Sequence, residues 1–235
     1  MVRRTVDLTA IDAEDTFLDN TPHSRSKYHK PVAQRGIPQH KEFVMWDGEG
    51  AANEDDSTKQ DYVLLGYYNG SEHKKLVTGR ALTTKECLDF IVAAGEANPD
   101  TYHVSFAFGY DVNMILRNLS HRQFAYLHKK HRITAFGYNI EHIPSKWLQV
   151  TRLETAFQRK HTVRIQDMFG FYQCSLVKAL QDNIPTHPLM VEHLDEIVVG
   201  KAQRDNFEYE NLDYIVKYWE IENVLAHALM NHCVM

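Results

Sequence analysis

The chain has 235 residues, 43% of them hydrophobic, and a formal net charge of -5 at pH 7. This length and apolar content suit one ordinary domain with extensions and allow a real buried core. No apolar run approaches the roughly 20 residues of a membrane span, and the N-terminus lacks the apolar centre of a signal peptide, so we expect a cytoplasmic protein with no membrane partner. The three cysteines form no CxxC pair, which argues against a disulfide framework or a zinc knuckle, and the negative charge argues against a general nucleic-acid coat.

The first 41 residues are polar and show no sustained apolar period. Within them, residues 23–41 carry five lysines and arginines and no acid. Such a basic arm could clamp a phosphate backbone or touch another subunit, although a solvated terminal arm is the commoner case. We therefore divide the chain into an N-terminal arm, residues 1–41, and one domain, residues 42–235.

The domain is expected to be organised around the sequence EFVMWDGEGA at residues 42–51. Its apolar run predicts a short buried strand that ends by presenting Asp47 and Glu49, which lie two positions apart and therefore on one face. Two neighbouring acids raise each other's pKa and are costly at the end of an apolar strand unless a cation joins them. A divalent metal is the favoured cation. A polar turn that ends a hairpin strand is the alternative.

The next elements complete an antiparallel start to the sheet. Two short apolar runs, residues 62–68 and 74–79, are separated by Asn69-Gly70, which is a strong hairpin signal. Thr83 or Thr84 then caps a helix that ends near residues 95–99.

A buried strand at residues 102–109 is expected to run into a helix at residues 110–120. The helix would turn Met114, Ile115 and Leu119 inward. Because open sheets with crossover helices bind ligands at the carboxyl ends of their strands, this order places Asp111 at a candidate site.

The second half of the domain begins with a basic helix or turn at residues 121–132 and a long hairpin at residues 133–164. A strand follows in which Asp167 shares a face with two apolar residues, so Asp167 either points toward the site or caps the next turn, and it stays outside the proposed metal ligands. A short helix at residues 175–183 and a loop at residues 184–200 complete this part.

The last element is predicted to be a long helix, residues 211–232, with an inward stripe made of Leu212, Ile215, Trp219, Ala226 and Leu229. Glu222 completes this stripe. A buried acid needs a partner, and a metal shared with the two strand acids would supply it, whereas an ion pair with Lys or Arg is the alternative.

Tyr218 lies one turn before Glu222 and can reach the same neighbourhood. A competing Tyr-x-x-x-Asp pattern is formed by Tyr209 and Asp213. Asp213 lies nine residues before Glu222, about two and a half turns, and so points away from the apolar stripe. Tyr218 and Glu222 are therefore preferred.

Three segments, WDGEG, FAFGYDVNMIL and YWEIENVLAHAL, together resemble the three exonuclease motifs in the proofreading domain of family B DNA polymerases, most closely those of protein-primed phages and linear plasmids. The segment RIQDMFGFYQCSLVKAL is also similar, and the resemblance spans about residues 42–232. It implies an α/β, ribonuclease-H-like (DnaQ-like) fold. In that fold a mixed sheet has three antiparallel strands first, then parallel strands, with helices on both faces.

The resemblance also implies roles for individual residues. The acids that would bind two Mg²⁺ or Mn²⁺ ions, about 4 Å apart, are Asp47, Glu49, Asp111 and Glu222. Tyr218 corresponds to the tyrosine that orients the attacking water, and Lys201 to a lysine that assists catalysis. The positions that would contact substrate are Tyr110, Met168 and Phe169, and for the aromatic residues among them a plain core role is the alternative.

Two departures from the family pattern bear on activity. Ala107 stands where many relatives have asparagine, and Glu222 stands where they have aspartate. Our leading expectation is a virus- or plasmid-encoded 3'-5' exonuclease acting on the 3' end of single-stranded DNA, either free-standing or the proofreading part of a longer polymerase, with a DNA polymerase or replication protein as candidate partner. The alternatives are an exonuclease-like module that binds single strands or a polymerase without cutting, and a 3'-5' exoribonuclease with the same acids.

Overall fold

The computed structural model describes residues 42–232 apart from residues 54, 57–58 and 205–206. The expected basic arm, residues 1–41, lies outside this part of the chain. No helix among the described residues has the length and apolar character needed to cross a membrane.

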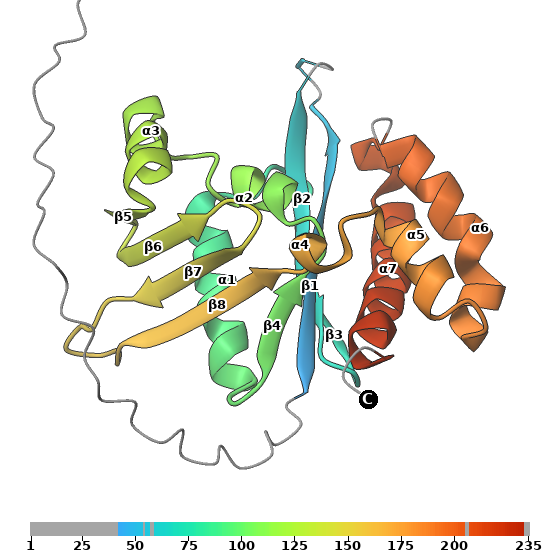
Figure 1. The fold of residues 1–235 in the computed structure, drawn as a ribbon. Helices are drawn as coiled ribbons and strands as arrows, with labels where there is room; N and C mark the ends of the chain where they lie inside the picture. Colours follow the sequence, from blue (N-terminus) through green and yellow to red (C-terminus); the bar gives the residue numbers. More distant parts are fainter. Residues whose placement is uncertain (1–41, 54, 57–58, 205–206, 233–235) are drawn as a thin grey trace, which may run out of the picture. The chain divides into compact units, whose positions relative to one another are not determined.

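An eight-stranded mixed sheet forms the centre of the domain, in the strand order β3-β2-β1-β4-β8-β7-β6-β5 (Figure 1). The first three strands are antiparallel, β1, β4 and β8 run parallel, and β8 to β5 are antiparallel again. The strands are β1 Phe43–Ala52, β2 Gln60–Tyr68, β3 His73–Val77, β4 Tyr102–Ser105, β5 Arg132–Ala135, β6 Tyr138–Ile143, β7 Trp147–Arg152 and β8 His161–Asp167. This architecture confirms the predicted mixed α/β class and is compatible with a ribonuclease-H-like fold.

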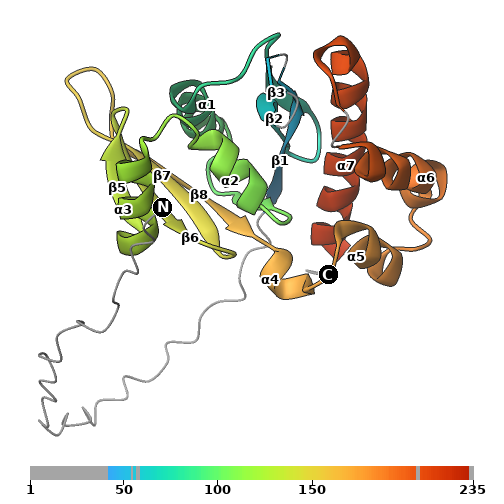
Figure 2. The ribbon, with the colours of Figure 1, turned by 90° about the horizontal axis from the view of Figure 1, so that it is seen from above.

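Helices flank both faces of the sheet at β1 to β3, as predicted. Figure 2 shows β1 to β3 between α1 and α2 on one side and α5, α6 and α7 on the other. The helices are α1 Thr84–Ala97, α2 Gly109–Ile115, α3 His121–Lys130, α4 Phe169–Tyr172, α5 Leu176–Asn183, α6 Pro188–Gln203 and α7 Leu212–His232. Thr83 caps α1 with a reciprocal capping box to Glu86, which fixes the start of the helix as its sequence indicates.

Strand β1 is longer than predicted, because it continues through Asp47 and Glu49 to Ala52. Pairing with β2 extends along this whole second half, so the Asp-Gly sequence forms no turn. Side chains alternate along the strand: Val44 and Trp46 join the core beneath α1, whereas Met45 packs toward α7. Both acids therefore lie on the α7 face of the sheet.

Two predictions about the second half of the chain are wrong. The expected loop at residues 184–200 is mostly helix α6, which starts with Pro188 at its first turn and buries Met190, Ile197 and Gly200 at helical spacing. The expected long hairpin at residues 133–164 has one strand more than predicted. Its first arm turns at Phe136 and Gly137, which both have positive φ, and divides into β5 and β6, so that β5 to β8 form a four-stranded meander.

The helix predicted at residues 110–120 is also shorter than expected, since α2 ends at Ile115. Its buried side chains are Val112 and Ile115, and the following Leu116 and Leu119 complete the apolar contact with α1. Met114 is only partly buried. The short helix still places Asp111 in its first turn.

Candidate metal centre

Three buried carboxylates converge where α7 crosses β1. Asp47 and Glu49 come from the strand and Glu222 from the helix, and one carboxylate oxygen of each lies within 4.8 Å of the others. Trp219 fixes the crossing, because its buried indole Nε1 donates a hydrogen bond to the backbone oxygen of Asp47 at 3.0 Å. The strand face and the helix stripe thus meet at the acids.

The competing Tyr-x-x-x-Asp pattern lies elsewhere. Asp213 is exposed, and the Tyr209 hydroxyl donates a hydrogen bond to Asp61 at 2.9 Å. By contrast, the buried Tyr218 hydroxyl donates to Glu222. The Tyr218 ring packs so closely against Gly200 of α6 that a Cβ at position 200 would lie 2.3 Å from it.

Asp111 borders the three-acid cluster but is not part of its close contact. Its carboxylate accepts a hydrogen bond from the Tyr62 hydroxyl at 2.8 Å. Burial and then repulsion from Asp47 raise the pKa of Asp111 well above its usual range. Gly48 makes room for this arrangement, since a Cβ there would lie 1.9 Å from the Tyr62 hydroxyl oxygen.

Two cations from the end of α6 face the acids. Lys201 Nζ lies 2.7 Å from Glu222. Arg204 donates to both oxygens of Glu49, at 2.7 and 3.0 Å, and a terminal nitrogen lies 3.7 Å from Asp47 and 3.8 Å from Glu222. The sequence resemblance indicated Lys201 but not Arg204. The signal was the three-residue spacing of these two cations, which places them on one face of a helix, but it applies only if residues 188–203 are recognised as helical.

The charges of the cluster are unevenly balanced. Burial, followed by repulsion from Glu222 and Glu49, raises the pKa of Asp47 well above its usual range. Burial raises the pKa of Glu49 to about 7 even though Arg204 opposes it. For Glu222, burial is outweighed by Lys201 and Arg204 and by hydrogen bonds from Lys201 and Tyr218, so its pKa is lowered. The cluster therefore has more buried acid than its two cations compensate.

The donor set suits a hard divalent cation. The buried Oδ2 atom of Asp47 accepts no hydrogen bond from any residue in the described part of the chain. All three converging side chains offer carboxylate oxygens, which Mg²⁺ and Mn²⁺ prefer, whereas zinc sites usually include His or Cys. The residues thus fit the metal type that the sequence indicated.

Asp167, the acid that stays outside the proposed metal ligands, has a structural role. Its carboxylate accepts hydrogen bonds from the backbone N–H groups of Ala107, Phe108 and Phe169, at 3.0, 3.1 and 2.9 Å. Asp167 therefore ties the turn after β4 to the start of α4. Ala107 sits in this turn with a φ of 59°.

The residues expected to contact substrate differ in exposure. Tyr110 and Phe169 are both 40% exposed, and the Tyr110 hydroxyl donates to Gln60 at 2.7 Å. Met168 is instead partly buried against the core formed with α5 and α7. Two of the three side chains thus present aromatic surface.

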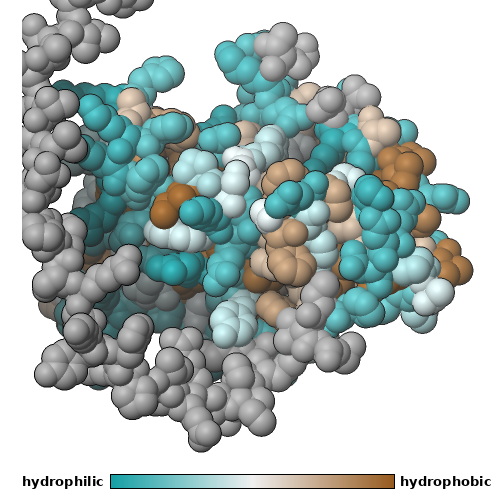
Figure 3. All heavy atoms as spheres, viewed as in Figure 1, coloured by the Kyte–Doolittle hydropathy of each residue, from teal (hydrophilic) through white to brown (hydrophobic). Residues whose placement is uncertain are grey.

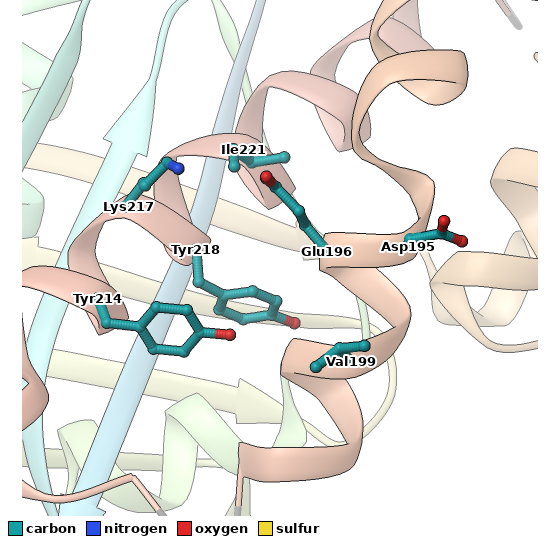
Figure 4. A pocket seen from close by; sticks show the side chains of 7 residues that line it. All are labelled: Asp195, Glu196, Val199, Tyr214, Lys217, Tyr218 and Ile221. Carbon is teal, nitrogen blue, oxygen red and sulfur yellow. The ribbon is translucent and has the colours of Figure 1, made fainter.

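A cavity of about 290 Å³ lies beside Tyr218, between α6 and α7 (Figure 4). Val199 of α6 faces the rings of Tyr214 and Tyr218, and the lining is completed by Asp195, Glu196, Lys217 and Ile221. None of the converging carboxylates lines it. The cavity borders the ring of Tyr218 and does not include the three-acid cluster.

No protein-family model and no curated protein matches the chain. Among solved structures, the chain is similar to phi29 DNA polymerase complexed with primer-template DNA, with a TM-score of 0.36 and 12% sequence identity. The similarity covers 63% of this chain and 24% of the polymerase chain.

Proposed function

We propose that this chain is a metal-dependent 3'-5' exonuclease that hydrolyses the last phosphodiester bond of single-stranded DNA. The observation that carries the proposal is the convergence of Asp47, Glu49 and Glu222, buried and with carboxylate oxygens within 4.8 Å of one another. The direction of cleavage and the preference for DNA come from the motif resemblance. Asp111 beside the cluster supplies the fourth acid of the set.

In this proposal the four acids hold two Mg²⁺ or Mn²⁺ ions. When bound, such ions activate a water and stabilise the leaving 3' oxygen. Tyr218 orients the water, and its pKa is raised by burial and by the charge of Glu222, so its hydroxyl keeps its proton. Lys201 holds Glu222 in the ionised form that a metal ligand needs.

Arg204 provides positive charge to the acids in the metal-free protein. It contacts all three carboxylates, and its side chain is 34% exposed, so it has a route to solvent when a divalent cation enters. Arg204 and a metal ion compete for the same oxygens of Glu49. This competition lowers the affinity for metal relative to an open site.

The same residue favours a second candidate function, a module that binds single strands without cutting them. If Arg204 holds the acids against any physiological concentration of divalent ions, the fold keeps the substrate path and loses the chemistry. A titration with Mn²⁺, monitored by calorimetry, separates the two candidates. Metal binding to the exonuclease saturates at millimolar Mn²⁺ or below, and the binding module shows no such saturation.

The activity test uses a single-stranded DNA oligonucleotide labelled at its 3' end, with Mg²⁺ or Mn²⁺. The native chain is expected to release the labelled terminal nucleotide, and Asp47→Ala to do so about a hundredfold more slowly or worse, because it removes a metal ligand. Asp213→Ala, which changes an exposed acid of the same helix α7, serves as the matched control. Equal release by the native chain and Asp47→Ala would refute the proposal, and an RNA oligonucleotide digested in parallel decides between exodeoxyribonuclease and exoribonuclease.

A further inference from the structure

A second feature of the sheet is the face of the strands β5 to β8 that lies opposite α1 and α3. Apolar side chains of these strands pack beneath α1 and α3; they include Ile133, Ile140, Val150 and Val163. Side chains alternate between faces, so the opposite face carries mainly polar residues, together with one aromatic ring and Ile143. We call this the open face; it consists of Arg132, Thr134, Asn139, Glu141, Ile143, Trp147, Gln149, Thr151, Thr162, Arg164 and Gln166.

The open face is continuous with the face that carries the acids. Gln166 of β8 pairs with Val104 of β4, and Val104 pairs with Met45 of β1. Met45 lies two residues before Asp47 on the same face. With strands about 4.8 Å apart, β8 lies roughly 10 Å across the sheet from β1. A chain bound on the open face could therefore reach the metal centre without crossing the sheet.

Charge is strongly segregated around this face. Between residues 112 and 166 the chain has ten lysines and arginines and only two acids, Glu141 and Glu154, although the whole chain has a net charge of -5. Figure 3 shows a mainly hydrophilic surface on the side of α3 and more apolar side chains on the side of α6. The positive charge is thus local to one half of the domain.

The pairing of these cations differs from that elsewhere. Outside residues 122–164, every described lysine and arginine except Lys217 forms an ion pair with a carboxylate. Within that range the described residues form a single such pair, between Arg152 and Glu96. The cations without an ion pair to a described acid are Arg122, Lys129, Lys130, Arg132, Lys146, Arg159, Lys160 and Arg164. Exposed cations without a paired acid among the described residues are available to a polyanion, since no described carboxylate has to be displaced.

Trp147 and Arg164 form the aromatic part of the open face. The Arg164 guanidinium lies 4.6 Å from the Trp147 ring centroid and is held there by hydrogen bonds to Gln149 at 2.7 and 2.9 Å. A guanidinium held over an aromatic ring is a planar cation on which a nucleobase can stack. Helix α4, which follows β8 directly, exposes the side chains of Phe169 and Phe171, at 40% and 68%.

We propose that the open face of β5 to β8 binds the unpaired strand upstream of the 3' end, with its cations on phosphates and the Trp147–Arg164 pair on a base. The proposal rests on the proposed exonuclease function, for which it supplies the path of the substrate. It explains how a chain with negative net charge binds a polyanion. A single strand fits better than a duplex, because stacking on the face requires exposed bases.

The test measures binding of a fluorescent single-stranded oligothymidine to the full chain by anisotropy, in EDTA so that no cleavage occurs. The triple variant Arg132→Gln, Lys146→Gln, Arg164→Gln is expected to bind about tenfold or more weakly, and the slope of log affinity against log salt to fall by about 2. The control is Lys59→Gln, Lys74→Gln, Lys178→Gln, which removes the same charge from exposed, ion-paired sites. It is expected to bind within about twofold of the native chain.

Tryptophan fluorescence gives a second readout at the face itself. Trp46 and Trp219 are fully buried, and Trp147 is the remaining tryptophan and is partly exposed. The oligonucleotide should quench the native emission, and Trp147→Phe should abolish the quenching. Native affinity in the triple variant, or binding without quenching, would overturn the proposal even if the chain proves to be an exonuclease. Loss of binding in the triple variant supports it even if no cleavage is ever seen.

Discussion

Glu49 should make the metal-free protein less stable as pH rises. Burial raises its folded-state pKa from 4.5 to about 7, so between these values the folded state holds more protons than the unfolded state. Stability is then fully present below about pH 4.5 and is lost as pH rises through about 7. The shift of about 2.5 units corresponds to about 3 kcal/mol, and Glu49 is only 1% exposed, so solvent screening removes little of it.

The perturbation is Glu49→Gln, and the assay is urea unfolding in EDTA from about pH 4.5 to 8. Because glutamine does not titrate, the fall in unfolding free energy over this range should be about 3 kcal/mol smaller in the variant. His103 titrates in both proteins and cancels in the comparison. Asp47 also titrates in both, but the variant lacks the repulsion from Glu49 that helps to raise the pKa of Asp47, so this contribution becomes smaller in the variant and acts in the same direction. The exposed Glu210→Gln should keep the native profile. Parallel profiles for Glu49→Gln and the native chain would refute this account of the buried acids.

Three further predictions concern the surroundings of the cluster. Arg204→Gln should raise the affinity for Mn²⁺ about tenfold, measured by calorimetry, because the substitution removes the competing cation. The control Arg80→Gln, at an exposed ion pair with Glu86, should leave the Mn²⁺ affinity unchanged. Weaker Mn²⁺ binding by Arg204→Gln would mean that Arg204 assists metal binding. Ala107→Gly should raise the free energy of unfolding in urea by about 1 kcal/mol, because position 107 has a φ of 59°, where a Cβ is unfavourable and glycine is not. A lower free energy of unfolding would show that Ala107 is not strained. Gly200→Ala should slow nucleotide release despite about 1 kcal/mol of added helix propensity, because its Cβ would meet the Tyr218 ring at 2.3 Å; a native rate would show that this packing does not position Tyr218.

The acids of the cluster could be found from sequence because each lies in a strongly periodic element. Asp47 and Glu49 follow a continuous apolar run and lie two positions apart, hence on one face of the strand, and Glu222 completes a stripe with helical spacing. Such patterns fix which face a side chain occupies once the element forms. Convergence of the faces then follows from packing α7 on β1.

What sequence missed depends on tertiary contacts. Asp-Gly in β1 resembles a turn, and only pairing with β2 keeps the strand extended. Arg204 lies at the end of α6, whose polar and apolar residues show a weak period, so a loop was expected and its side chain could not be aimed at Glu49. The role of Asp167 likewise requires the position of the turn at Ala107, sixty residues earlier in the chain.

The central claim is that buried carboxylates from β1 and α7 form a binding site for divalent cations. Its most direct test is anomalous diffraction from crystals soaked in Mn²⁺, with crystals of Asp47→Asn treated identically. The account predicts a strong anomalous peak between Asp47, Glu49 and Glu222, with Arg204 turned away from Glu49, and no such peak in the variant. A soaked native crystal with no peak at these carboxylates, and with Arg204 still bound to Glu49, would contradict it.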